Sequence, residues 1–112
     1  MLARWEATKL SALRDLATAY RIASEGGRWF SVEFIKRDGS LRKMVCRLGV
    51  KSHLRGGKQA YDPQQYNLMT VFDAGKLDYR MVPTDPNRVL RVKGRGTILF
   101  ENNDVAHHDA QE

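Results

Sequence analysis

The chain has 112 residues, a usual length for one domain, and the 42% that are hydrophobic can form a single small core. Lys and Arg outnumber Asp and Glu by 19 to 13, which gives a formal net charge of +6 and a pI near 9.8. The sequence contains no apolar run of the roughly 18 residues that span a membrane and no signal-peptide pattern. Its single cysteine excludes an intrachain disulfide. We therefore expect a cytoplasmic domain without a membrane partner.

Residues 1–27 predict a helix, because Leu10, Leu13 and Tyr20 recur at helical spacing and Gly26-Gly27 offers a left-handed stop. A helix of about 24 residues is roughly 36 Å long, which exceeds the width of a small barrel. Two arrangements are open. The helix packs wholly on its own domain, or its first turns overhang and form a homodimer or bind another partner.

After the helix, the period of the apolar residues changes to two, which is typical of strands. Phe30, Val32 and Phe34 are expected to face the core. A tight hairpin turn is expected over 37–40, where Asp38-Gly39 suits the positive φ of such turns.

The return strand of this hairpin is expected over 41–47. Its alternation leaves two inward pairs open, Met44 with Cys46 or Leu41 with Val45. Its three basic residues are expected to reach solvent: Arg42, Lys43 and Arg47.

An irregular loop is expected over 48–66, followed by a second hairpin with strands 68–72 and 79–82. A single helical turn is then expected over 84–87 and a strand over 89–92. Residues 97–100 are expected to form either a sixth strand or a bulged continuation of the fifth. Residues 101–112 carry four acids and no base, and are expected to be disordered. The chain thus divides into a helix (1–27), a β-barrel (28–100) and an acidic tail (101–112). One helix followed by five or six short strands is a mainly β pattern typical of SH3-like and Sm-like barrels.

Several segments between Trp29 and Gly94 resemble one known group of proteins. They are Trp29-Phe30-Ser31-Val32-Glu33-Phe34 with Asp38-Gly39-Ser40 and Arg42, Cys46-Arg47-Leu48-Gly49-Val50-Lys51, Gly56-Gly57-Lys58, Tyr61-Asp62-Pro63, the stretch 68–73, and Tyr79-Arg80. Together they resemble the small, often phage-borne Sm-like SH3 barrels that are related to the WYL domain. The chain has Trp29-Phe30-Ser31 in place of the Trp-Tyr-Leu tripeptide that names the larger family. The resemblance implies the fold and a ligand-sensing or nucleic-acid-sensing context, often in phage or defence settings.

Basic residues are concentrated between Arg28 and Lys58, where nine of them accompany only two acids. A basic surface on a small β-fold indicates a polyanionic partner, first of all DNA or RNA. The candidate nucleic-acid-binding residues are Arg37, Arg42, Lys43, Arg47, Lys51, Arg55 and Lys58 for phosphates and Tyr61 for base stacking. A second basic run comprises Arg88, Arg91, Lys93 and Arg95, and whether it adjoins the first is open.

The sequence contains no recognisable catalytic motif, so we expect neither an enzyme nor a metal or cofactor site. Cys46 is interpreted as a buried structural thiol, and Asp73 and Asp78 as turn caps. The first hypothesis is a non-catalytic nucleic-acid-binding or regulatory module, borne by a phage or mobile element. The alternative is a protein-binding inhibitor or adaptor of a host defence or nucleic-acid-processing machine, whose acidic groove would receive the basic surface.

Overall fold

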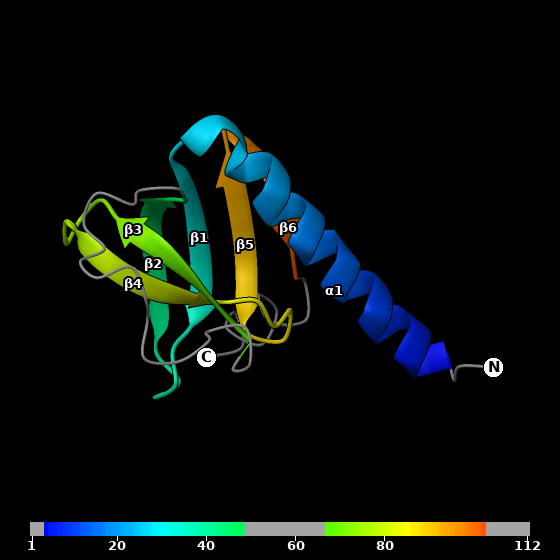
Figure 1. Cartoon of the computed structure of the whole chain (residues 1–112). Helices are drawn as coiled ribbons and strands as arrows, with labels where there is room; N and C mark the ends of the chain where they lie inside the picture. Colours follow the sequence, from blue (N-terminus) through cyan, green and yellow to red (C-terminus); the bar gives the residue numbers. More distant parts are fainter. Residues whose placement is uncertain (1–3, 49–66, 103–112) are drawn as a thin grey trace, which may run out of the picture.

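The computed structural model describes residues 4–48 and 67–102, with the backbone alone for residues 4–9 (Figure 1). The elements are helix α1 (Arg4–Ala23), a short 3₁₀ turn (Glu25–Gly27), and strands β1 (Phe30–Ile35), β2 (Leu41–Arg47), β3 (Leu68–Asp73), β4 (Asp78–Pro83), β5 (Val89–Gly94) and β6 (Thr97–Glu101). The predicted N-terminal helix and both predicted hairpins are confirmed. The segment after Gly96 is a sixth strand rather than a bulged continuation of the fifth.

All six strands belong to one antiparallel sheet with the order β4-β3-β2-β1-β5-β6. The sheet curls, so that β4 comes into contact with β1, three places away in the order (Figure 1). The edge strands β4 and β6 do not pair with each other, and the sheet is therefore not closed. The predicted mainly β class with one helix is confirmed, whereas a closed barrel is not observed.

The register of β1 and β2 decides which side chains face the core. Phe30 lies opposite Cys46 and Val32 lies opposite Met44, and all four side chains are buried. Met44 and Cys46 are thus the inward pair of the two that alternation allowed. At the connecting turn, the carboxylate of Asp38 accepts a hydrogen bond from the backbone N–H of residue 40 at 2.9 Å, as expected of an Asp in this turn.

Helix α1 packs against β5 and β6 through the side chains of its last turns. Leu16 and Ala23 are buried in the common core, and the hydroxyl of Tyr20 donates a hydrogen bond to the carbonyl oxygen of Pro83 at 2.8 Å. Helix α1 ends at Ala23, and Gly26 in the 3₁₀ turn that follows has a φ of 70°, the left-handed conformation predicted for the stop.

The N-terminal half of α1 extends beyond the strands (Figure 1). Leu10 and Leu13, at its midpoint, are 48% and 46% exposed, whereas Leu16 is 1% exposed. The overhang expected from the helix length is therefore present, and its exposed leucines are available to a partner.

Most strands extend one or two residues beyond the predicted bounds, and the segments after β4 differ from expectation in two further ways. The turn before β5 is a single hydrogen-bonded turn rather than a helical one: the N–H of Arg88 donates to the carbonyl of Asp85 at 2.9 Å. Strand β6 continues through Glu101, and the N–H of Asn102 donates to the carbonyl of Leu90 at 2.8 Å. These first two residues of the predicted tail are therefore part of the folded domain, and residues 103–112 lie outside the described residues.

Candidate polyanion-binding site

Five cationic side chains and four apolar ones line a pocket of about 320 Å³. They come from the β1–β2 hairpin, the start of β3, β4 and the turn before β5: Phe34, Lys36, Arg37, Arg42, Met44, Leu68, Arg80, Met81 and Arg88. Phe34 and Met44 are buried and form the apolar base, while Lys36 and Arg37 are exposed at the rim. The volume is at the lower end of the range typical of small-molecule sites.

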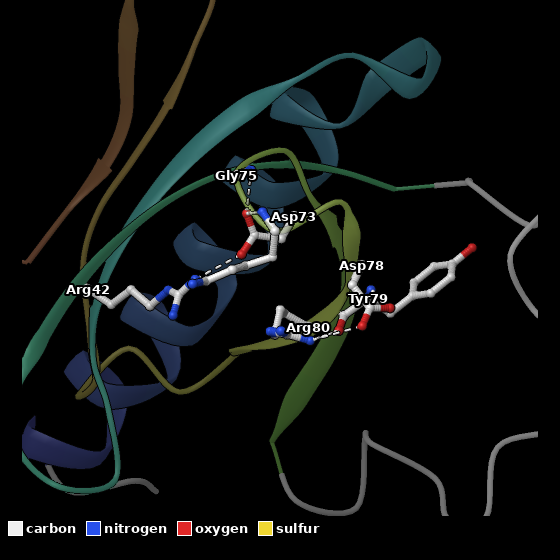
Figure 2. Close-up of polar contacts among 7 residues, drawn as sticks. Arg42, Asp73, Gly75, Asp78, Tyr79 and Arg80 are labelled. Carbon is white, nitrogen blue, oxygen red and sulfur yellow. Dashed lines mark hydrogen bonds and ion pairs between the residues drawn. The ribbon is translucent and has the colours of Figure 1, made fainter.

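Arg42 enters the pocket because its position on β2 is opposite the inward-facing Phe34. Its guanidinium forms an ion pair with the carboxylate of Asp73 at 2.8 Å, and the two side chains are 28% and 3% exposed (Figure 2). Arg42 was expected to reach solvent; strand alternation places it on the inner face of the sheet, where its side chain is only partly exposed. A charge in that position is tolerated because the buried carboxylate compensates it.

Asp73 also caps the β3–β4 turn, as its sequence position predicted. Its second carboxylate oxygen accepts the backbone N–H of Gly75 at 2.8 Å and that of Lys76 at 3.3 Å (Figure 2). One nearly buried carboxylate thus holds both the turn and the Arg42 guanidinium.

Arg88 is fixed at another side of the pocket. Its Nε and Nη2 atoms donate to the carbonyl oxygen of Ile35, the last residue of β1, at 3.2 and 2.9 Å. No described carboxylate forms an ion pair with this guanidinium. Its position is therefore set by a neutral acceptor and its full positive charge remains.

The other pocket cations lie nearer to solvent. Arg80 contacts Asp78 at 3.4 Å and donates to the carbonyl of Tyr79 at 2.9 Å (Figure 2). Asp38, in the turn beside the rim, keeps a lowered pKa because the side chain and backbone N–H of Ser40 donate to it, with a smaller contribution from Lys36. The pocket therefore has five cations, two of them paired with acids, and a third carboxylate nearby.

Two further predicted site residues lie on the opposite, outer face of the sheet. Lys43 is 61% exposed and its Nζ is 4.0 Å from a carboxylate oxygen of Glu33. Arg47 lies over the indole of Trp29, with its Cζ 4.7 Å from the ring centroid, and its buried Nε has no hydrogen-bond partner among the described residues. Trp29 is 43% exposed, so this cation–π pair is accessible from solvent.

The predicted site is therefore divided. Arg37 and Arg42 join the pocket, Lys43 and Arg47 belong to the outer face, and four of the predicted residues lie outside the described residues: Lys51, Arg55, Lys58 and Tyr61.

The second basic run is divided as well. Arg88 joins the pocket, whereas Arg91 lies on the outer face between Glu33 and Glu101, at 2.6 and 2.7 Å. These two carboxylates offset the charge of Arg91 and raise its pKa, chiefly through the hydrogen bond to Glu101. Lys93 shares that face, whereas Arg95 lies in the turn between β5 and β6.

Sequence reasoning did not select Lys36, Arg80 or the apolar base of the pocket. Arg80 belongs to a strand almost 40 positions after Arg42, and only the curl of the sheet brings both to one pocket. The available signal was a lone arginine in the predicted strand 79–82, whose other residues are Tyr79, Met81 and Val82.

The described residues offer no other obvious reactive centre. Cys46 is fully buried, and this burial raises the pKa of its thiol to about 12, as befits a structural cysteine. Among residues 4–48 and 67–102 there is no group of three His, Cys, Asp or Glu side chains placed to hold a metal ion. Within the same residues, no helix has the length and apolar character needed to cross a membrane.

Comparison with known proteins gave no match to a family model, to a curated protein or to a solved structure. The candidate site is therefore interpreted from its geometry alone.

Proposed function

We propose that this protein is a non-catalytic nucleic-acid-binding module whose contact surface includes the basic pocket. The observation that supports it is the convergence of five cations from three separate segments on one cavity of about 320 Å³. Cations dispersed for solubility would not be expected to meet in a hollow, where like charges repel each other.

The distribution of charge favours an anionic ligand. Lys36, Arg37 and Arg88 form no ion pair with a described carboxylate, and all three line the same pocket. A phosphate at this side would meet up to three positive charges. Each such contact releases condensed counterions from a nucleic acid, which makes binding depend steeply on salt.

The fold type is part of the proposal. The order of one helix, antiparallel strands and a turn before β5, together with the curled sheet, supports a relation to the small Sm-like SH3 barrels beside the WYL domains. On that relation we propose a cytoplasmic protein of phage or mobile-element origin with a regulatory role.

A protein-binding adaptor is the second candidate. It is favoured by the exposed apolar side chains that the domain leaves uncovered, notably Leu10 and Leu13 on the overhanging helix. A protein partner or a second copy would bury them, and the basic pocket would then receive acidic side chains.

The test of nucleic-acid binding is fluorescence polarisation with labelled single-stranded and double-stranded DNA and RNA at about 50 mM and about 200 mM salt. The variant K36E/R37E reverses two exposed pocket cations without removing a described hydrogen bond of their side chains. We expect its affinity to fall at least about tenfold at the lower salt, with a shallower salt dependence because two phosphate contacts are lost.

The matched control is R14E/K76E, which changes the net charge by the same amount at exposed positions that do not line the pocket. Equal losses in both variants would reduce the effect to net charge and contradict a localised site. No binding of any oligonucleotide by the unaltered protein at low salt would refute the nucleic-acid proposal and favour the adaptor.

A further inference from the structure

The pocket combines two chemistries that a phosphate backbone alone does not need. Leu68 and Met81 are partly exposed and supply apolar surface above the buried Phe34 and Met44, and cations surround it. Binding gains free energy from such apolar surface only when an apolar or aromatic part of the ligand covers it. The ligand therefore has an anionic part and a flat or apolar part, and the two are close enough together to occupy one small cavity.

The cations that border the apolar base are held in place before any ligand arrives. Arg42 is held by Asp73 at 2.8 Å, and Arg88 is held by the carbonyl of Ile35 at 2.9 Å. Guanidinium groups fixed in this way lose less conformational entropy on binding than free ones, which favours a defined ligand over a diffuse ionic cloud.

We propose that this pocket receives one unpaired nucleotide of a single-stranded nucleic acid. Its phosphate is held by Arg88, with Lys36 and Arg37 at the rim. Its nucleobase covers the apolar side chains of Leu68 and Met81. This assignment rests on the proposed function and names its substrate class. In a duplex the bases are paired and stacked, so only phosphates could reach the rim, and no nucleobase could pack on Leu68 and Met81.

The volume agrees with this occupant. About 320 Å³ is at the lower limit of cavities that hold small organic ligands, so the pocket has room for one nucleotide-sized group and not for several. Neighbouring nucleotides of the strand would then lie outside it, across the basic rim.

The test compares a labelled single strand of about 12 nucleotides with a strand of the same length whose sugars and phosphates are intact but whose bases are absent. Both carry the same charge, so any difference in affinity reports on the bases. We expect the abasic strand and a duplex of equal length each to bind about tenfold more weakly than the normal strand.

The variant M81Q replaces an apolar pocket side chain by a polar one of similar length. We expect it to weaken binding of the normal strand more than binding of the abasic strand, and so to narrow the difference between the two. Leu68→Gln, on the adjacent strand, is the second variant if M81Q fails to fold, and circular dichroism establishes which variants are folded.

Equal affinity for the normal and abasic strands would overturn the nucleotide assignment and leave the proposed function in place. Absence of binding to all strands at low salt would overturn both. Displacement of the strand by equimolar free deoxyadenosine monophosphate would overturn the single-strand assignment and identify a free nucleotide as the ligand, because a unit of a strand gains rim contacts that a free nucleotide lacks.

Discussion

At the scale of single residues, Arg42 and Lys43 are neighbours in sequence but have opposite surroundings. Arg42 points inward to the carboxylate of Asp73, while Lys43 is 61% exposed on the outer face. The runs of basic residues could be found in the sequence, but each member's environment depends on the strand register and on a partner more than 30 positions away.

Removing the carboxylate of Asp73 should destabilise the protein. Asp73→Ala leaves the partly buried Arg42 without its counterion and the turn without its acceptor for the Gly75 N–H. We expect a loss of about 3 kcal/mol in the free energy of unfolding, measured by urea denaturation. Asp78→Ala, which removes a carboxylate that is 66% exposed, should cost less than about 1 kcal/mol, and similar losses in both would contradict a special role for Asp73.

The Cys46 thiol should make stability fall at high pH. Burial raises its pKa from 9.0 to about 12, so the unfolded chain loses the thiol proton at a lower pH than the folded protein does. The stabilisation is complete below about pH 9 and is lost as pH rises toward the folded pKa, by about 1 kcal/mol for each pH unit. Tyr20, whose pKa burial also raises, adds to the same trend at still higher pH.

Urea denaturation at several values between roughly pH 8 and pH 11 measures this dependence. Cys46→Ala serves as the control, because it removes the thiol and should show a smaller decline. The idea fails if the decline is the same with and without the thiol.

At the scale of secondary structure, the sequence patterns correctly predicted the helix and the first five strands, and left the segment after Gly96 open between a sixth strand and a bulged continuation. They identified these elements because helices and strands that pack on one core have different and simple repeats. They could not show how closely α1 approaches the sheet, which depends on a glycine. A Cβ atom at Gly94 would be 3.3 Å from the Cα of Ala23 and 3.1 Å from Cδ1 of Leu99.

Gly94→Ala should therefore push α1 away from β5. We expect a loss of about 1–3 kcal/mol in the free energy of unfolding, since the helix backbone cannot yield as a flexible side chain can. Gly75→Ala is the matched control, because its nearest contact would be an ordinary 3.4 Å and its φ is not in the left-handed region. A smaller loss at Gly94 than at Gly75, measured by thermal or urea unfolding, would argue against tight packing at that contact.

At the scale of the whole molecule, the candidate site is a product of the curl of the sheet. The β1–β2 hairpin supplies Lys36, Arg37 and Arg42, and the approach of β4 adds Arg80 and the turn before β5 adds Arg88. The salt-dependence and abasic-strand experiments belong to this scale, since they test whether these separate segments act as one surface. The overhang of α1 is likewise a property of the assembled molecule, because it depends on where the sheet ends beneath the helix.

By itself, the sequence determined the fold class, the positions of the turns and the excess of positive charge, because periodicity, turn chemistry and composition are local properties. Only the tertiary structure decided that Arg42 is paired and inward, that Arg47 stacks on Trp29, and that Arg80 and Arg88 share a pocket with the first hairpin. The physical reason is that a charged side chain becomes part of a binding site only through the residues around it, and these are distant in the chain. Those neighbours follow from the strand order and curvature of the sheet, which local residue patterns do not encode.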